Sequence, residues 1–354
     1  MSDTTRSRRP PPPLPVIVLT GFLGAGKTTL LNRLLADPAL ADTLVIVNEF
    51  GEIGLDHLLV ETIREDLVLL SSGCICCAVR GDLVTTLEEM LRARDNGRIA
   101  PFARVIIETT GLADPAPVLN VFASHPYLSL RFVVARLVTV VDAVNGSATL
   151  AAHPEAVRQA ALADTLVLSK ADLANPGTVS RIDAELDALN PTATRLRTGD
   201  TLDTAALLEA AERPPAIATQ PQTPGHLSRD SGIRSFTLVR EAPIHPGALD
   251  LFLDLLRSAH GPNLLRMKGL VALTDAPDEP VVLHAVQHVL HPPRRLPAWP
   301  DNDRRTRLVF ILKDLDAAFV ERLWGAFAGE LRTDAPDAAA LTDNPLAIPG
   351  QPSR

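Results

Sequence analysis

The stretch "GFLGAGKT" at residues 21–28 is the strongest indication of the fold. It fits the pattern G-x-x-x-x-G-K-[ST], in which the backbone N–H groups of a glycine-rich turn surround phosphate oxygens. It follows the apolar run "PVIVLTG" at 15–21, which predicts a buried strand, and it opens "KTTLLNRLLAD" at 27–37, which has helical spacing. A glycine-rich turn without a ligand is the alternative. Spacing and context together favour a phosphate-binding loop.

The residue types in this loop suit a nucleotide. Gly21, Gly24 and Gly26 allow backbone N–H groups to crowd around phosphate oxygens. We expect Lys27 to reach the β- and γ-phosphates and Thr28 to ligate Mg²⁺. The loop therefore predicts a site for a nucleotide and its magnesium ion.

Further apolar runs alternate with helical patterns. The runs lie at residues 43–49, 66–73, 103–111, 135–143 and 164–172, and "ATRLRTGD" at 193–200 could add one more. Helical stretches separate them, for example 82–97, which ends at a glycine. This alternation predicts an α/β fold: a P-loop NTPase whose mostly parallel sheet is flanked by helices. Ligand loops should then lie at the carboxyl ends of the strands.

A second unit follows a change in composition. Residues 212–232 are rich in Pro, Thr, Ser and Gln, which is typical of a linker. Strand patterns and two amphipathic helices follow, and they predict a smaller α+β domain. These patterns lie at 233–241, 246–261, 264–273, 279–292, 305–314 and 315–329. We expect a Pro-rich disordered arm at 1–13, a P-loop domain at 14–212, a linker at 213–232, a C-terminal domain at 233–335 and a flexible tail at 336–354.

The run "VIIETTG" at 105–111 places an acid and a glycine where an apolar strand ends. Glu108 could complete the Mg²⁺ shell or polarise the attacking water, and the Gly111 N–H could sense a γ-phosphate. Alone, Glu108 could equally be a carboxylate in solvent. Beside a phosphate loop it is a catalytic candidate, together with Lys27 and Thr28.

The motif "SKAD" at 169–172 indicates which nucleotide base is bound. It is similar to N-K-x-D, whose aspartate accepts hydrogen bonds from guanine N1 and from the N2 amine, a pair of donors that adenine lacks. Asp172 would take this role, and Lys170 would lie along the base. Ser169 stands where Asn is usual, so one contact is shortened or lost. A Lys–Asp loop pair is the alternative, and guanine is favoured over adenine.

All three cysteines lie within "SSGCICCAVR" at 71–80, as Cys74, Cys76 and Cys77. Thiolates so close together suit a soft or borderline ion such as Zn²⁺. No second cysteine pair is present to complete four sulfurs. The predicted site is therefore open, which suits a transferable metal better than a structural one. Three small buried residues and a dithiol redox switch are the alternatives.

The acidic stretch "NEFGEIGLD" at 48–56 follows the second predicted strand. It could be a switch segment that senses Mg²⁺ or the γ-phosphate, with Glu49 as an oxygen ligand to metal. Water, a partner's group, Glu52, Asp56 or His57 could be the fourth ligand of the cysteine site. A solvated acidic loop is the alternative.

The other polar clusters carry less chemistry. If 279–292 is one strand, His284 and His288 share a face and His291 takes the other, so a histidine metal site is not favoured. A further set of arginines is interpreted as a solvated, partner-facing patch. It comprises Arg294, Arg295, Arg304, Arg305 and Arg307.

Composition excludes several classes. The formal net charge of −8 argues against non-specific nucleic-acid binding. No apolar run approaches the roughly 18 residues that a membrane helix needs. The start of the chain lacks the apolar core of a signal peptide, and three clustered cysteines cannot build a disulfide framework. We therefore expect a cytoplasmic protein that binds neither nucleic acid nor membrane.

The order and wording of "GFLGAGKTT", "NEFGEIGLD", "GCICCAVRGDL", "ETTGLADPAPV" and "SKAD" closely resemble the CobW family of P-loop GTPases. "RMKGLVAL" and "PAWP" resemble the C-terminal domain of that family, so the likeness covers roughly residues 14–330. It implies a GTPase that handles zinc or another transition metal and matures a client metalloenzyme. It also matches the phosphate loop to Gly21–Thr29, which adds Ala25 and Thr29 to the nucleotide contacts. The histidine-rich tract of many members is missing here.

These observations lead to one hypothesis: GTP hydrolysis at the phosphate loop is coupled to metal binding at the cysteines and to delivery to a client. The expected cofactors are GTP, Mg²⁺ and Zn²⁺ or another transition metal. A client metalloprotein is the expected partner, and a homodimer is left open. A P-loop kinase acting on a small molecule and a nucleotide-regulated thiol switch are the alternatives.

Overall fold

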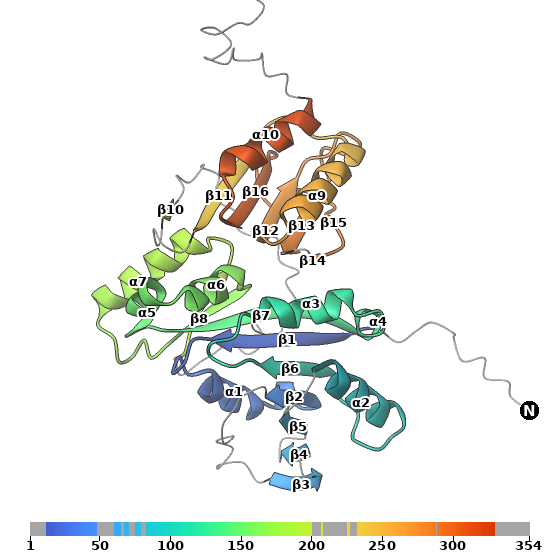
Figure 1. Cartoon of the computed structure of the whole chain (residues 1–354), viewed down its shortest axis with the longest axis vertical. Coiled ribbons are helices and arrows are strands. Elements are labelled where there is room, and N and C mark those ends of the chain that lie inside the picture. Colours follow the sequence, from blue (N-terminus) through green and yellow to red (C-terminus); the bar gives the residue numbers. More distant parts are fainter. Residues whose placement is uncertain are drawn as a thin grey trace, which may run out of the picture.

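In the computed structural model, the chain forms two units, each built on its own β-sheet (Figure 1). The structure describes residues 12–47, 60–64, 67–70, 75–78, 83–199, 207, 225–226, 232–287 and 289–329. For 60–64, 67–70, 75–78 and 225–226 it describes the backbone alone. The predicted arm, the predicted tail and most of the predicted linker therefore lie outside the described residues.

The described part of the first sheet has nine strands in the order β3-β4-β5-β2-β6-β1-β7-β8-β9. They are β1 (Leu14–Gly21), β2 (Thr43–Val47), β3 (Val60–Arg64), β4 (Leu67–Leu70), β5 (Ile75–Ala78), β6 (Arg104–Glu108), β7 (Phe132–Asp142), β8 (Thr165–Ser169) and β9 (Thr194–Arg197). From β5 to β9 the neighbours pair in parallel, whereas β3, β4 and β5 pair antiparallel. The predicted mostly parallel sheet is confirmed.

Helices cover both faces of this sheet because its strands are apolar on both sides. Val16 and Val18 of β1 belong to one core, and Ile17 and Leu19 belong to another on the opposite face. The second core is covered by α1 (Lys27–Leu35), which follows the glycine loop, with the short 3₁₀ helix η1 (Pro38–Leu40) beside it. The helices of the first core are α2 (Leu83–Asp95), α3 (Ala116–Ser124), α4 (Leu128–Arg131), α5 (Gly146–Ala152), α6 (Pro154–Leu162) and α7 (Pro176–Leu189).

Two details of this sheet differ from the prediction. The run at 66–73 is only the second strand of an antiparallel pair, because the preceding "VETIR" forms β3 and alternates too weakly to be recognised. Cys76 and Cys77 lie in β5, a further strand of the sheet that is not among the predicted apolar runs. Cysteine behaves as a small apolar residue, so "ICCA" can continue the buried sheet.

The register brings the strand ends that carry polar residues to one edge. Leu19 in β1 lies opposite Glu108 in β6, and Asp142 in β7 lies opposite Ser169 in β8. Because these strands are parallel, the loops that follow them open at the same carboxyl edge. The sheet therefore gathers the phosphate loop, the acidic strand end and the "SKAD" loop.

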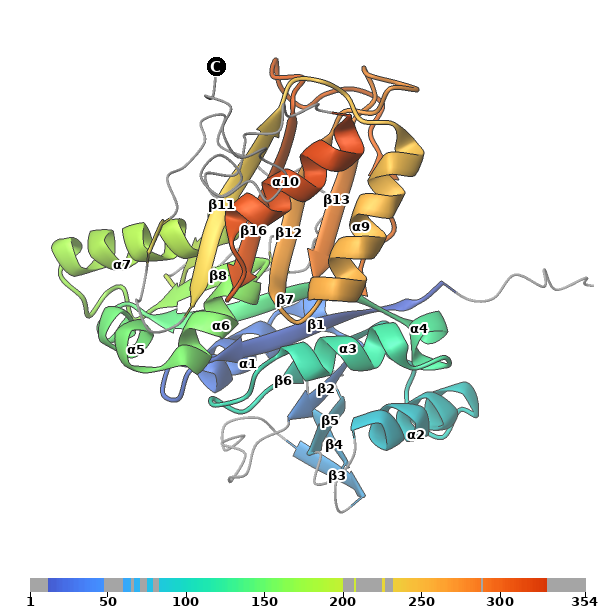
Figure 2. The same cartoon turned by 45° about the horizontal axis from the view of Figure 1, so that its top comes forward.

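The second unit is an antiparallel sheet with two helices on one face (Figure 2). Its strands are β10 (Gly225–His226), β11 (Ile233–Arg240), β12 (Leu264–Val271), β13 (Val281–Val286), β14 (Val289–Leu290), β15 (Arg294–Arg295) and β16 (Thr306–Lys313). The helices α9 (Pro246–His260) and α10 (Ala317–Ala328) meet where Phe252 packs edge-on against Trp324, with ring centroids 5.1 Å apart. The predicted α+β class is confirmed. Strand β10 comes from the predicted linker and pairs with β11.

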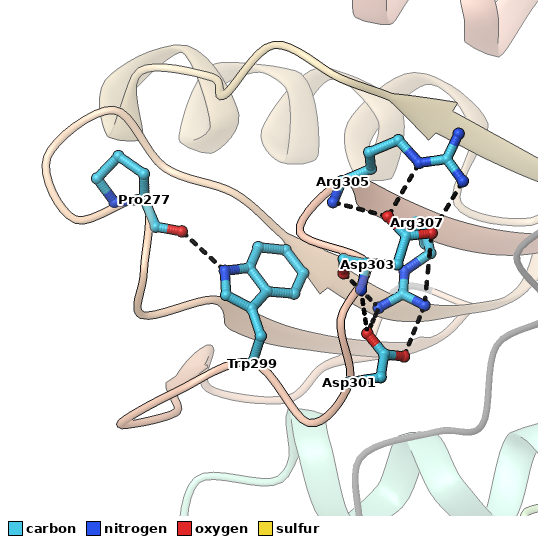
Figure 3. A network of polar contacts seen from close by, with 6 residues as sticks. All are labelled: Pro277, Trp299, Asp301, Asp303, Arg305 and Arg307. Carbon is cyan, nitrogen blue, oxygen red and sulfur yellow. Dashed lines mark hydrogen bonds and ion pairs between the residues drawn. The ribbon is translucent and has the colours of Figure 1, made fainter.

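A polar network fixes the loop before β16 (Figure 3). Arg307 is 1% exposed, and its Nη1 and Nη2 donate to the two carboxylate oxygens of Asp301, both at 2.8 Å. Asp303 pairs with Arg305 in the same loop, and Trp299 Nε1 donates to Pro277 O at 2.8 Å. The expectation of a solvated arginine patch is thus wrong for Arg307. The spacing of the arginines in the sequence does not show that Asp301 and Asp303 neutralise Arg307.

The expectation of one strand at 279–292 is also wrong. The chain turns at Gln287, whose φ is 52°, and returns as β14. The His291 N–H then donates to His284 O at 2.9 Å, and the two imidazoles stack with centroids 4.4 Å apart. His284 and His291 therefore lie together rather than on opposite faces. His288 lies outside the described residues.

Buried polar contacts join the two units. Arg266 on β12 donates from Nη2 to Asp164 Oδ1 at 2.5 Å and from Nη1 to Leu162 O, at the end of α6, at 2.6 Å. Arg266 is 1% exposed and Asp164 is 6% exposed. Ser235 on β11 donates to Ala188 O on α7 at 2.6 Å. Because a buried charge without its partner costs about 3–5 kcal/mol, the Arg266–Asp164 pair favours one relative position of the units.

Candidate nucleotide and metal site

The phosphate loop has the backbone shape that its glycines predict. Gly24 has φ 71° and Gly26 has φ 94°, in the left-handed region that side chains disfavour. Lys27 begins α1, is 5% exposed, and donates from Nζ to Phe22 O at 3.4 Å. Its ammonium group thus folds back over the loop. The helix α1 begins directly after the glycine loop, and the backbone N–H groups at a helix N-terminus suit an anion.

A hydroxyl and a carboxylate meet beside the loop. Thr28 Oγ1 donates to Glu108 Oε1 at 2.9 Å, and Glu108 is completely buried. Next to Glu108, Thr109 Oγ1 donates to Thr20 Oγ1 at the end of β1, at 2.8 Å. The two predicted magnesium ligands of the described chain, Thr28 and Glu108, therefore lie side by side. Hard oxygen donors of this kind are what Mg²⁺ requires.

Gly111 lies directly against the phosphate loop. A Cβ atom placed on Gly111 would come within 2.7 Å of the Leu23 backbone nitrogen and within 2.6 Å of Leu23 Cδ2. Only glycine allows the segment after β6 to approach the loop so closely. The structure therefore brings together the two segments that were predicted to contact the γ-phosphate.

The "SKAD" segment holds the phosphate loop from the other side. Ser169 Oγ donates to Ala25 O at 2.6 Å, so serine at the usual asparagine position keeps a bond to the loop. Lys170 Nζ donates to Gly24 O and to Asp142 Oδ2, both at 2.8 Å. Lys170 has φ 55°, which turns the chain sharply after β8. Its ammonium group is therefore fixed between the loop and an aspartate.

Sequence reasoning missed Asp142. It ends β7, and its carboxylate also accepts from the backbone N–H groups of Val144 and Asn145. Burial by itself raises the pKa of Asp142, but the hydrogen bonds from Lys170 and from these amides outweigh it and hold the pKa below its ordinary value. Its position at the end of an apolar run, like that of Glu108, was the available signal.

An open pocket of about 470 Å³ lies between α1 and the loops that follow β8 and β9. It is lined by Gly26, Thr29, Leu30, Arg33, Ser169, Lys170, Asp172, Leu173, Thr198 and Gly199. Asp172 is exposed on its wall, and Thr29 lies on α1 beside the phosphate loop. A nucleotide with its phosphates in the loop could place its base in this pocket. Arg33, Thr198 and Gly199 were not predicted from the sequence.

The predicted metal ligands are described only in part. Cys74 and Glu49 lie outside the described residues, as do Glu52, Asp56 and His57. Within the part of the chain that the structure describes, no group of three or more His, Cys, Asp or Glu residues is placed to hold a metal ion. The backbone of Cys76 and Cys77 is described, and its register with β2 locates both residues in the sheet.

This register places the cysteine strand close to the nucleotide edge. Cys77 lies opposite Ile46 in β2, and Ile46 lies opposite Ile107 in β6. Cys77 is therefore two strands away from the residue that precedes Glu108. At about 4.8 Å per strand, this separation is roughly 10 Å. The strands β5, β2 and β6 all run toward the same carboxyl edge.

Two family models match the chain. The model of the CobW/HypB/UreG nucleotide-binding domain matches residues 15–197, which is more than half of the chain. The model of the cobalamin synthesis protein CobW C-terminal domain matches residues 233–328. This protein belongs to the CobW family. The resemblance seen in the motifs is thereby confirmed for both units of this CobW-family protein.

This CobW-family protein is similar to two proteins and one solved structure whose names refer to zinc. It is 30% identical over 322 residues to the zinc chaperone YjiA of Escherichia coli K12, covering 90% of this chain and 98% of the relative. It is 35% identical over 185 residues to the zinc-regulated GTPase metalloprotein activator 1 of Schizosaccharomyces pombe, covering 50% and 44%. The crystal structure of Zn(II)-bound YjiA GTPase superposes with a TM-score of 0.73, at 29% identity, covering 90% of this chain and 99% of that one.

None of the helices in the described ranges is both long enough and apolar enough to cross a bilayer.

Proposed function

We propose that this CobW-family protein is a GTPase that carries zinc and delivers it to a client metalloprotein. One observation carries the proposal. A single sheet edge joins the phosphate loop, the Thr28–Glu108 pair and a pocket with Asp172 on its wall. Its relatives are named zinc chaperones and a zinc-regulated GTPase metalloprotein activator, which supports zinc as the cargo.

The site residues can lower the barrier to γ-phosphate hydrolysis by charge neutralisation and positioning. Lys27 and the loop amides bind the phosphate oxygens, whose negative charge the loop dipoles favour. Thr28 and Glu108 would hold Mg²⁺, directly or through water, and a bound Mg²⁺ would supply further positive charge at the phosphates. Gly111 would offer its N–H to the γ-phosphate, and Glu108 or its bound water would orient the attacking water.

The base pocket favours guanine. An ionised Asp172 is an acceptor only, and guanine presents two adjacent donors at N1 and N2. Adenine presents one acceptor and no donor at these positions, so its binding would leave the carboxylate unpaired. Lys170, fixed by Gly24 O and Asp142, would cover one side of the base.

We further propose that zinc binds through Cys74, Cys76 and Cys77, and that Glu49 of the acidic segment is an oxygen ligand of the Mg²⁺ shell. The separation of about two strands between Cys77 and the β6 end supports coupling between the two sites. A cytoplasmic location fits this proposal, because the thiols must stay reduced to bind metal. The client is a metalloprotein, and a homodimer remains compatible with the fold.

The function is tested by measuring phosphate release from GTP and from ATP in the presence of Mg²⁺. We expect GTP to be hydrolysed, ATP to be hydrolysed much more slowly, and Lys27→Ala to abolish both rates. The product should be free phosphate. Preference for ATP, or transfer of the phosphoryl group to a small-molecule acceptor, would replace the proposal with the kinase alternative.

A further inference from the structure

The segment that carries Gly111 is held by a buried side chain that none of the motifs contains. Gln159 lies on α6 and is completely buried. Its Nε2 donates to Gly111 O at 3.1 Å and to Ala113 O at 3.0 Å. One amide group therefore fixes two carbonyls of the same turn. The preceding residue, Arg158, adds an ion pair to Asp114 in this turn at 3.1 Å.

Gln159 is itself held on its other sides. Thr139 Oγ1 on β7 donates to the backbone carbonyl of Gln159 at 2.8 Å, which fixes α6 to the sheet. At the end of α6, Asn190 Nδ2 donates to three carbonyls, those of Ala160, Ala161 and Ala163. Thr139 therefore anchors the part of α6 that carries Gln159, whereas Asn190 fixes the end of the helix beyond it.

Rigid support matters at this position because of what Gly111 touches. Its backbone lies against Leu23 of the phosphate loop, so a small shift of the turn changes the distance between the Gly111 N–H and a γ-phosphate. Misplacement by about 1 Å can cost roughly 10²-fold in rate. The α- and β-phosphates, in contrast, would be bound by the phosphate loop itself, whereas both hydrogen bonds that the Gln159 amide donates go to the Gly111 turn.

We propose that Gln159 is a positioning residue for GTP hydrolysis: it sets the place of Gly111 and so the grip on the γ-phosphate. This inference rests on the proposed GTPase function and deepens it. It assigns no direct contact between Gln159 and the nucleotide. It predicts that losing the two donated hydrogen bonds separates hydrolysis from nucleotide binding.

The test compares Gln159→Met with Asn190→Leu in the full chain. Methionine keeps the length of the side chain and loses both donors, whereas Asn190→Leu removes a buried amide at the end of α7 that donates to the end of α6 and does not touch the Gly111 turn. For each variant we would measure GDP affinity, affinity for a non-hydrolysable GTP analogue, and single-turnover hydrolysis of saturating GTP with Mg²⁺.

We expect Gln159→Met to hydrolyse GTP about 10- to 100-fold more slowly. It should also bind the GTP analogue more weakly, while its GDP affinity stays within twofold of wild type. Asn190→Leu should unfold at lower temperature and keep its hydrolysis rate per folded molecule. If Gln159→Met does not fold, Arg158→Ala replaces it, with a smaller loss of rate expected.

Three results would overturn the inference. In the first, Gln159→Met hydrolyses GTP within threefold of wild type. In the second, its GDP affinity falls by the same factor as its rate, and in the third, Asn190→Leu loses as much rate. Each of these leaves wild-type hydrolysis intact and so leaves the proposed function standing. Absence of GTP hydrolysis by the wild type would remove the proposed function and, with it, this inference.

Discussion

At the scale of single residues, the hydrogen-bonded pair of Thr28 and Glu108 is the proposed reacting centre. We predict that Thr28→Ala lowers GTP hydrolysis by a factor on the order of 10² to 10³, the cost of losing one oriented group at a transition state. The variant should also need more Mg²⁺ for half-maximal activity, because Glu108 then lacks the Thr28 hydroxyl with which it would hold the ion. A magnesium titration of the hydrolysis rate measures both effects. An unchanged magnesium requirement would contradict the assignment.

In the proposed function, Asp172 on the pocket wall selects guanine over adenine. Hydrogen bonds to a charged group contribute about 1.5–3 kcal/mol, so we predict that Asp172→Asn weakens GDP binding roughly 10- to 150-fold. An asparagine amide can donate to the carbonyl at C2 of xanthine, so the variant should gain affinity for xanthosine diphosphate. Competition binding with the two nucleotides checks this. Equal GDP affinity in variant and wild type would show that Asp172 does not contact the base.

Some residues of the candidate site could be predicted from the sequence, and others could not. The phosphate loop, Glu108, Gly111 and "SKAD" were predicted because strand ends and glycines in a row mark the carboxyl edge of a parallel sheet. Asp142 and Gln159 were not predicted. Each acts through contacts with residues more than twenty positions away, and no local spacing encodes such contacts.

At the scale of elements, the loop before β16 offers a direct comparison of a buried and an exposed ion pair. Arg307 is 1% exposed, so Asp301→Ala leaves a buried guanidinium short of a partner. We predict a loss of about 1–3 kcal/mol in the free energy of unfolding. Asp278→Ala is the matched control, because Asp278 and Arg304 are 78% and 71% exposed and such pairs contribute little.

Urea denaturation, followed by the fluorescence of Trp299 and Trp324, measures this difference. The control variant should stay within about 0.5 kcal/mol of wild type. Equal losses in the two variants would show that the Arg307–Asp301 pair is no more important than a surface pair.

Elements also show why some predictions were wrong. The run at 279–292 is apolar and β-branched enough for one long strand, but Gln287 adopts a left-handed conformation and the chain doubles back. Glutamine has no special preference for that conformation, and the turn is accompanied by contacts that the local sequence does not specify, among them the stacking of His291 on His284 and the bond from the Gln287 N–H to Leu265 O. Strands as short as β3 and β10 are likewise set by their neighbours rather than by their own sequence.

At the scale of the whole molecule, the junction of the two units is sensitive to acid. Burial lowers the pKa of His284 and of His291, despite the attraction of Asp164. Burial likewise lowers the pKa of Lys268 to about 8. Burial would raise the pKa of Asp164, but the charges of Arg266, His284 and Lys268 hold it well below its ordinary range. The cluster therefore already holds more cations than anions, with Arg136 nearby.

The sign of the pH dependence follows. A histidine whose pKa is lower in the folded than in the unfolded state stabilises the protein at neutral pH. It loses that contribution as the pH falls below about 6.5, by at most about 1.4 kcal/mol per pH unit. Asp164 stays ionised in both states above pH 5, so it adds nothing in this window. We predict that stability falls between pH 7 and pH 5.

A double variant, His284→Gln with His291→Gln, isolates this effect. Its urea midpoint should change less between pH 7 and pH 5 than that of wild type, whose remaining histidines are shared by both proteins. The same pH dependence in the two proteins would show that this pair does not weaken the junction in acid.

The proposed zinc delivery requires a link between nucleotide and metal, and the cysteine strand lies two strands from the acidic end of β6. The decisive measurement is a competitive zinc titration with a non-hydrolysable GTP analogue, with GDP and without nucleotide, on wild type and Cys76→Ser. We predict zinc dissociation constants that differ between nucleotide states by about fivefold or more in wild type. Zinc must then change the affinity for the GTP analogue by the same factor. Cys76→Ser should bind zinc weakly in every state. Equal zinc dissociation constants in all three nucleotide states of wild type would contradict the account.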